Sequence, residues 1–438
     1  MSSASRRVVI TGFGLISPLG NSPEAVWEAL RAGRSGVGPL TCLPEQAVPT
    51  RVAGEARSFA GRIGDFGDLN NDQKRKIRKG LKVMCREIQM GVAAAQLALQ
   101  DSRLQPGDYD QDRTGIVSGC DHIVTQPEEF TEGIRSCLDE QGQFQFGRWA
   151  TDGLPKVTPL WLLKYLPNMP ASHLAIYNEL RGPNNSITMR EASSNLAVAE
   201  AYSTIARGDA EIMIAGATGT RLHPLRAVQV SLQEQIAPGD GEPAGASRPF
   251  DRDREGMVLG EGAAAIVLED LRTAESRGAR IWGEVVGAGC SAVLDRQGRA
   301  DISVALQNVI RLCLQRSGCQ PQELGHIHAH GIATVEGDIQ EARAIAAVFG
   351  KEGGGVPVTA AKSYTGNLGA ASGLVELIAS VLAMNEGFLF PILNYRNADP
   401  AATILAVREG GGEPGSSFLN LNATPQGQAS GVLIRCIS

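Results

Sequence analysis

Strand-like and helix-like segments alternate along almost the whole chain, and this alternation constrains the fold more than any other feature. Short β-branched or apolar runs such as residues 7–11 (RVVIT) and 114–118 (TGIVS) are typical of buried strands. Helical segments lie between such runs; one spans residues 22–32, with Ser22 as predicted N-cap and Pro23 at the first helical position. This order predicts an α/β fold with buried sheets.

The strand–helix order begins again in the second part of the chain. Residues 193–207 predict a helix that Gly208 can cap. After residue 270, strands are predicted at 283–288, 325–329, 356–360, 419–422 and 431–434, and helices at 303–317, 338–349 and 374–385. We therefore expect two similar α/β halves, residues 1–270 and 271–438, without a long linker between them.

Composition excludes several classes of function. The net charge of −6 argues against a general nucleic-acid binder. The N-terminus lacks a signal peptide, and apolar runs such as residues 377–384 are too short to span a bilayer, so a cytoplasmic protein without a membrane segment is expected. The eight cysteines show neither Cys-x-x-Cys nor metal-site spacing. They are predicted to be free thiols, with no metal and no cofactor.

Five segments carry a resemblance to a known family. They are RRVVITGFGLISPLGNSPEAVWEALRAGRSGV, RGDAEIMIAGAT, SRPFDRDREGMVLGEGAAAIVLEDL, HAHGIATVEGD and KSYTGNLGAASGLVE, in this order along the chain. Together they resemble the β-ketoacyl-acyl-carrier-protein synthases of the type II elongating kind, which belong to the thiolase superfamily. The resemblance implies the thiolase fold, in which two similar α/β halves form αβαβα layers around two buried central helices, and it implies a dimer.

The resemblance also implies a cysteine nucleophile, which this chain lacks. Condensation in the family needs a thiolate that accepts an acyl chain from a carrier thioester. Counting from Gly182-Pro183 on one side and from Gly208-Asp209 on the other places Glu191 at the cysteine position. Cys120, in a turn that is glycine-rich in the family, is not favoured as a relocated nucleophile.

Two further departures fall on the same site. The first family histidine corresponds to His330 and the motif lysine to Lys362, but Asn367 stands at the second histidine position. The family's glycine-rich loop corresponds to residues 422–431 (NATPQGQASG), where Pro425 removes a backbone donor. Three departures at one site predict that condensation is lost.

Glu191 has alternative interpretations. A carboxylate at a helix N-terminus is stabilised by free N–H groups, so its pKa should fall unless burial dominates. A structural role is predicted, in which Glu191 pairs with Arg190, His330 or nearby N–H groups. The alternative is a malonyl-carrier-protein decarboxylase, or another carrier-thioester enzyme, that uses Glu191 and His330.

Two surfaces suggest partners. Trp161, Tyr165 and Met169 lie in a segment that resembles the family's acyl-tunnel and dimer-interface region. The predicted long helix over residues 74–101 begins with basic side chains that could contact an acidic acyl carrier protein, namely Lys74, Arg75, Arg78, Lys79 and Lys82. A solvated helix face is the alternative.

The sequence therefore leaves three functions open. The leading hypothesis is a non-condensing partner subunit, similar to a chain-length factor, that pairs with a cysteine-bearing ketosynthase in fatty acid or polyketide synthesis. The second is the decarboxylase or related enzyme. The third is an inert homodimer that binds acyl chains or acyl carrier protein.

Overall fold

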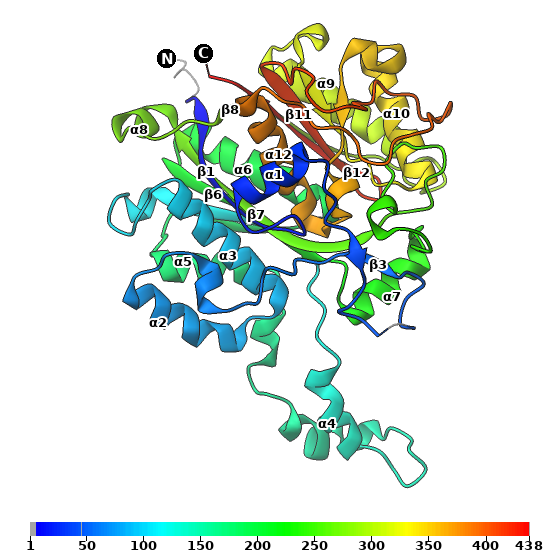
Figure 1. Cartoon of the computed structure of the whole chain (residues 1–438). Coiled ribbons are helices and arrows are strands. Elements are labelled where there is room, and N and C mark those ends of the chain that lie inside the picture. Colours follow the sequence, from blue (N-terminus) through cyan, green and yellow to red (C-terminus); the bar gives the residue numbers. More distant parts are fainter. Residues whose placement is uncertain (1–5, 45, 438) are drawn as a thin grey trace.

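The computed structural model describes residues 6–44 and 46–437, and in this part of the chain the strands form one continuous 12-stranded sheet (Figure 1). Most strands are fully buried, because their sequences are runs of Val, Ile, Ala and Gly without polar alternation. The strands are β1 (Val8–Ile16), β2 (Gly38–Pro39), β3 (Val52–Gly54), β4 (Thr114–Cys120), β5 (Asn184–Thr188), β6 (Ile212–Thr220), β7 (Leu259–Asp270), β8 (Gly283–Ala292), β9 (His326–His328), β10 (Val358–Thr359), β11 (Ser417–Ala423) and β12 (Gln428–Arg435).

The sheet consists of two strand series with the same order. From the outer edge inward, the first runs β5-β4-β6-β7-β1 and the second runs β10-β9-β11-β12-β8. In each series the outer strands are parallel and the inner ones antiparallel. The series meet where β1 pairs with β8, from Val8 opposite Val285 to Ile10 opposite Gly283. The repetition agrees with two similar halves, while the boundary at residue 270 stays a prediction.

Helices lie on both faces and between the two series. Helices α3 and α5 cover the first series, α9 and α10 cover the second, and α1, α6 and α12 lie between them. This layering confirms the predicted α/β class. The helices are α1 (Pro23–Arg31), α2 (Asn71–Gly80), α3 (Arg86–Asp101), α4 (Glu128–Ser136), α5 (Met169–Asn178), α6 (Ser193–Arg207), α7 (Pro224–Gln233), α8 (Leu271–Ser276), α9 (Ile302–Ser317), α10 (Val335–Phe349), α11 (Lys362–Thr365) and α12 (Ser372–Glu386).

Local sequence signals explain most helix ends, with one exception. Ser22 Oγ accepts the Ala25 N–H at 3.2 Å and so caps α1, and Gly208 ends α6 with a φ of 86°. The single long helix predicted over residues 74–101 is wrong. The chain becomes extended at Met84, and the Cys85 N–H donates to the Lys164 carbonyl at 3.3 Å. Because this N–H bonds to a distant carbonyl and not within a helix, the basic helix α2 and the buried helix α3 are separate.

The segment of residues 126–165, which contains α4 and is called here the α4 lobe, projects from the body of the protein (Figure 1). It exposes several large apolar side chains, among them Phe144, Phe146, Leu160 and Leu162. Within the described ranges, the helices are all too short or too polar to cross a bilayer.

Candidate functional site

Glu191 lies in a tight turn between β5 and α6. Residues Arg190–Ala192 form one 3-10 turn, and Arg190 adopts a left-handed φ of 50°, which a non-glycine residue keeps only when its surroundings require it. The Ser193 hydroxyl accepts the Met189 N–H at 2.8 Å and holds the turn closed. The Glu191 side chain is therefore directed into the protein, with 0% exposure.

The carboxylate of Glu191 is held mainly by a guanidinium group. Arg221 Nη2 donates to Glu191 Oε1, Arg190 Nε lies 3.4 Å from Oε2, and Asn367 Nδ2 donates to Oε1 at 3.0 Å. Burial alone would raise the pKa of Glu191, but the charges of Arg221 and Arg190 outweigh it and hold that pKa below its ordinary value. Glu191 is thus a buried anion.

These contacts belong to a longer row of alternating charges, called here the buried ion chain. It consists of Asp121, Arg221, Glu191, Arg190 and Glu234. Arg221 is fully buried, and its Nη1 lies 3.3 Å from Asp121 Oδ2. At the other end, Arg190 Nη2 pairs with Glu234. Such a chain is stable only when complete, because removing one member leaves a neighbouring charge buried without compensation.

A second polar group surrounds His330 and is called here the His330 cluster. Lys362 Nζ donates to the His330 carbonyl at 2.7 Å, lies 3.2 Å from His330 Nδ1 and pairs with Glu376. Asn422 Nδ2 donates to Glu376 Oε2 at 2.7 Å. Burial and the nearby Lys362 charge lower the pKa of His330 far below its ordinary value, so its imidazole is neutral at pH 7.

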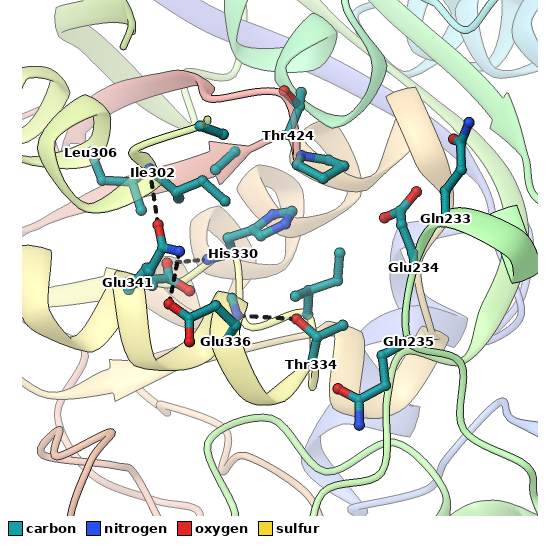
Figure 2. A pocket seen from close by; sticks show the side chains of 16 residues that line it. Gln233, Glu234, Gln235, Ile302, Leu306, His330, Thr334, Glu336, Glu341 and Thr424 are labelled. Atoms are coloured by element: carbon teal, nitrogen blue, oxygen red, sulfur yellow. Dashed lines mark hydrogen bonds between the residues drawn. The ribbon is translucent and has the colours of Figure 1, made fainter. Parts of the chain in front are cut away.

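A cavity of about 300 Å³ reaches His330. Figure 2 shows the imidazole directed into it, with Glu234 on the facing wall. Glu191, Lys362 and Asn367 are not among the residues that line it. Those residues are Gln233, Glu234, Gln235, Ala300, Ile302, Leu306, His330, Ile332, Thr334, Glu336, Gly337, Gln340, Glu341, Ala423, Thr424 and Pro425. The buried ion chain therefore meets this cavity at Glu234, while Glu191 lies deeper in the protein.

The four residues that the motifs indicated as candidate site residues form two contacting pairs. Glu191 contacts Asn367, and His330 contacts Lys362. The predicted pairing of Glu191 with Arg190 and the predicted fall of its pKa are both found, whereas the alternative of helix N–H donors is not. Among the described residues its Oε1 accepts hydrogen bonds from the Arg221 and Asn367 side chains, and its Oε2 has no hydrogen-bond partner.

The three residues of the segment that resembles the acyl-tunnel region lie away from the cavity at His330, and their role at a tunnel stays a prediction. Trp161 packs edge-on against Phe130 with ring centroids 4.9 Å apart, and Met169 is the first residue of α5. Tyr165 donates to Glu129 Oε1 at 3.0 Å and lines a separate cavity of about 560 Å³. None of these three residues lines the cavity at His330.

The basic side chains lie on or just after α2. Arg75, Arg78, Lys79 and Lys82 are exposed and Lys74 is half-buried. Arg75 Nη2 contacts Asp72 at 2.7 Å, so part of its charge is neutralised within the helix. Arg78, Lys79 and Lys82 face solvent.

Sequence reasoning missed the largest fully buried side chain of the site, Arg221. One signal could have found it, since Arg221 follows the apolar strand β6 directly and a charge at the end of a buried strand needs a partner. Asp121 occupies the matching place after β4. The sequence separation of these two residues from Glu191 follows no regular pattern, so the sequence alone does not reveal that they lie near it.

No metal site is evident in the described ranges, and Cys120 does not offer a reactive thiol there. No group of three or more His, Cys, Asp or Glu side chains there is arranged to hold a metal ion. Cys120 is fully buried, and burial together with the charges of Glu87 and Asp121 raises the pKa of its thiol well above the ordinary value. A thiolate at Cys120 is therefore strongly disfavoured.

Comparisons with known proteins agree with the architecture. A structure of a beta-ketoacyl synthase from Burkholderia phymatum has a TM-score of 0.83 and 28% identity, covering 99% of this chain and 100% of that one. The ishigamide ketosynthase/chain length factor structure has a TM-score of 0.83 and 27% identity, with the same coverage. The fold thus defines a protein of the ketosynthase class.

Sequence comparisons identify the family. Residues 5–274 match "Beta-ketoacyl synthase, N-terminal domain" and residues 282–396 match "Beta-ketoacyl synthase, C-terminal domain". The chain is 33% identical over 395 residues to 3-oxoacyl-[acyl-carrier-protein] synthase 2 of Coxiella burnetii, covering 90% of this chain and 89% of that protein. It is 34% identical over 403 residues to the chloroplastic synthase I of Arabidopsis thaliana, covering 90% and 79%. This chain belongs to the beta-ketoacyl synthase family, whose members act in fatty acid and polyketide synthesis.

Proposed function

We propose that this chain is a non-condensing member of the family that acts as a chain-length-factor-like partner of a cysteine-bearing ketosynthase. The observation that carries the proposal is the buried, ion-paired carboxylate of Glu191 at the position that motif spacing assigns to the nucleophile. A carboxylate that accepted an acyl group would form an anhydride, which cannot replace the thioester of an acyl-enzyme.

The surroundings of Glu191 also oppose its use as a catalyst. Its lowered pKa keeps it from donating a proton at neutral pH, and Arg221 occupies the carboxylate oxygen Oε1. Asn367 offers an amide where the family places a histidine, and its side chain is already bonded to Glu191. These features weigh against the decarboxylase alternative as well.

Two features support a protein partner. Strand β5 is an outer strand of the sheet and all five of its residues are exposed or half-buried, so its backbone can pair with another strand. The α4 lobe presents apolar side chains to solvent, including Phe146 at 77% and Leu160 at 58% exposure. The similarity to the ishigamide ketosynthase/chain length factor favours a related ketosynthase as this partner.

An acyl carrier protein is the proposed second partner. The relatives named above are synthases whose names specify an acyl-carrier-protein substrate. The exposed cations Arg78, Lys79 and Lys82 near the end of α2 would meet an acidic carrier surface favourably.

The proposal is tested by combining purification with turnover measurements. The chain is expressed alone and together with the cysteine-bearing ketosynthase encoded in the same genome, and each sample is incubated with acyl- and malonyl-carrier protein. We expect a stable mixed dimer and no acyl group on this polypeptide by intact-protein mass spectrometry. Condensation or decarboxylation by the lone chain, or a homodimer that never exchanges with the synthase, would contradict the proposal.

A further inference from the structure

Another cavity, called here the arginine pocket, is lined by the end of α3 and by the residues that follow α8. Its volume is about 770 Å³, within the range of about 300–1,000 Å³ that is typical of small-molecule sites. Its lining residues are separate from the cavity at His330, the buried ion chain and the His330 cluster. The charged side chains that line it are Asp101, Arg103, Asp108, Arg277 and Arg280.

Arg277 is the fixed donor of the arginine pocket. Its Nε donates to Glu269 Oε2 at 2.9 Å, its Nη2 donates to Glu269 Oε1, and its Nη1 donates to the Ser102 carbonyl at 2.8 Å. Because Glu269 is fully buried, the guanidinium is held from the protein side. In the hydrogen bonds of the described residues, two of the five N–H groups of Arg277 have no acceptor. They are left for an anionic group such as a phosphate, which a preset guanidinium binds well.

Arg103 adds a second cation at a cost in backbone energy. It directly follows Ser102, the C-cap of α3, and has a φ of 58°, a left-handed conformation that favours glycine. Its side chain is exposed and lines the arginine pocket. A charged residue kept in this conformation points to a function of the side chain.

A stack of flat groups forms another part of the wall. The rings of Phe13 and Trp282 have centroids 4.5 Å apart, and the guanidinium carbon of Arg280 lies 3.4 Å from the centroid of the Trp282 ring. Arg280 is exposed, and its side chain has no acceptor among the described residues. Guanidinium planes stack on aromatic rings and on nucleobases, so Arg280 offers a face for a flat heterocycle.

The two aspartates weigh against a simple anion such as phosphate alone. Asp101 Oδ2 accepts the Phe13 N–H, and Asp108 Oδ2 accepts the Gln105 N–H, both at 3.0 Å. In the hydrogen bonds of the described residues, the second oxygen of each carboxylate has no donor. These oxygens repel an anion but accept from hydroxyl groups. The arginine pocket therefore suits a ligand that combines an anionic group with hydroxyl donors and a flat ring.

We propose that the arginine pocket binds a nucleoside monophosphate, with its phosphate on Arg277 and Arg103. The ribose hydroxyls donate to Asp101 and Asp108, and the base stacks on Arg280. The inference goes beyond the proposed function and does not depend on it, because the pocket shares no residue with the site around Glu191.

The experiment is a calorimetric titration of the full chain in a phosphate-free buffer. The probes are adenosine and guanosine 5′-monophosphate, the two matching nucleosides and inorganic phosphate. We expect at least one nucleotide to bind about tenfold or more tightly than its nucleoside and than inorganic phosphate, because only the nucleotide engages the arginines, the aspartates and the stack together.

Two exposed arginines separate the parts of the site. Arg103→Gln should weaken binding of the nucleotide at least about fivefold and leave the nucleoside unchanged, whereas Arg280→Gln should weaken both. Arg272→Gln is the matched control, because that arginine is exposed on α8 and does not line the pocket. No binding of either nucleotide, binding of inorganic phosphate as tight as that of the nucleotide, or an equal loss in the Arg272→Gln control would overturn the inference.

Discussion

Arg221→Met should be among the most destabilising single substitutions in this protein. The guanidinium is fully buried and contacts Glu191 and Asp121, whose side chains are 0% and 2% exposed. Methionine fills a similar volume but leaves two carboxylates without their shared cation. Breaking one buried ion pair in this way costs about 3–5 kcal/mol, so we expect a loss near the upper end of that range.

The free energy of unfolding is obtained from urea titrations at pH 7, followed by circular dichroism. The decisive measurement is a double-mutant cycle with Glu191→Gln, which removes one of the stranded charges. We expect Arg221→Met to lower the free energy of unfolding by at least about 2 kcal/mol less in the Glu191→Gln background than in the natural chain. Arg207→Met serves as control, because that arginine is 62% exposed and pairs with Asp209 at the surface, where the expected cost is about 0–1 kcal/mol.

The pH dependence of the folding stability independently checks the direction of the Glu191 pKa shift. In the natural chain the pKa of Glu191 is lowered, so its stabilisation is present above the ordinary glutamate pKa of about 4.3 and is lost as the pH falls below that value. Without Arg221, burial raises the pKa of Glu191, and stability is instead lost as the pH rises. The difference in free energy of unfolding between Arg221→Met and the natural chain should widen from pH 4.5 to 7. A coupling energy below about 0.5 kcal/mol, or a gap independent of pH, would refute this account of the site.

Three further predictions concern the solvent accessibility of position 191, the titration of Glu341 and the binding of an acyl carrier protein. Glu191→Cys should leave a thiol that iodoacetamide does not modify in the folded chain, as read by peptide mass spectrometry, and adding Arg190→Ala should raise its modification at least tenfold. Burial raises the pKa of Glu341 to about 8, so its contribution to stability falls as the pH rises from about 4.5 to 8; urea unfolding of Glu341→Gln should show a weaker decline over this range. Reversing both Lys79 and Lys82 to Glu should weaken binding of an acidic acyl carrier protein about tenfold in 50 mM NaCl and far less in 0.5 M NaCl, as measured by surface plasmon resonance.

Much of the fold could be predicted from the sequence because its strands are buried on both faces. Such strands read as continuous apolar runs, and the predicted strand at residues 114–118 lies within β4 (Thr114–Cys120). The helix α6 was predicted with its bounds, since Gly208 marks its end. The long helix over 74–101 failed because its break depends on a bond from Cys85 to the distant carbonyl of Lys164, which no local pattern reveals.

The site was only partly predictable. Motif spacing indicated Glu191, Asn367, His330 and Lys362, and the structure places them in contact as two pairs. Arg221 could not be linked to Glu191, because their contact depends on the packing of β6 beside the turn before α6. Fold topology, rather than residue spacing, determines which charges become partners in a buried network.

The two strand series divide the polar interior in an unexpected way. Every member of the buried ion chain comes from the first half, since Glu234 is the last of them along the chain, and every member of the His330 cluster comes from the second half. The Asn367–Glu191 hydrogen bond joins one half to the other at this place. Chimeras that exchange halves between homologues would therefore transplant each network whole. Mismatches would arise at the bonds that cross the seam, which include those from Asn367 to Glu191 and from Asn195 to Asn422.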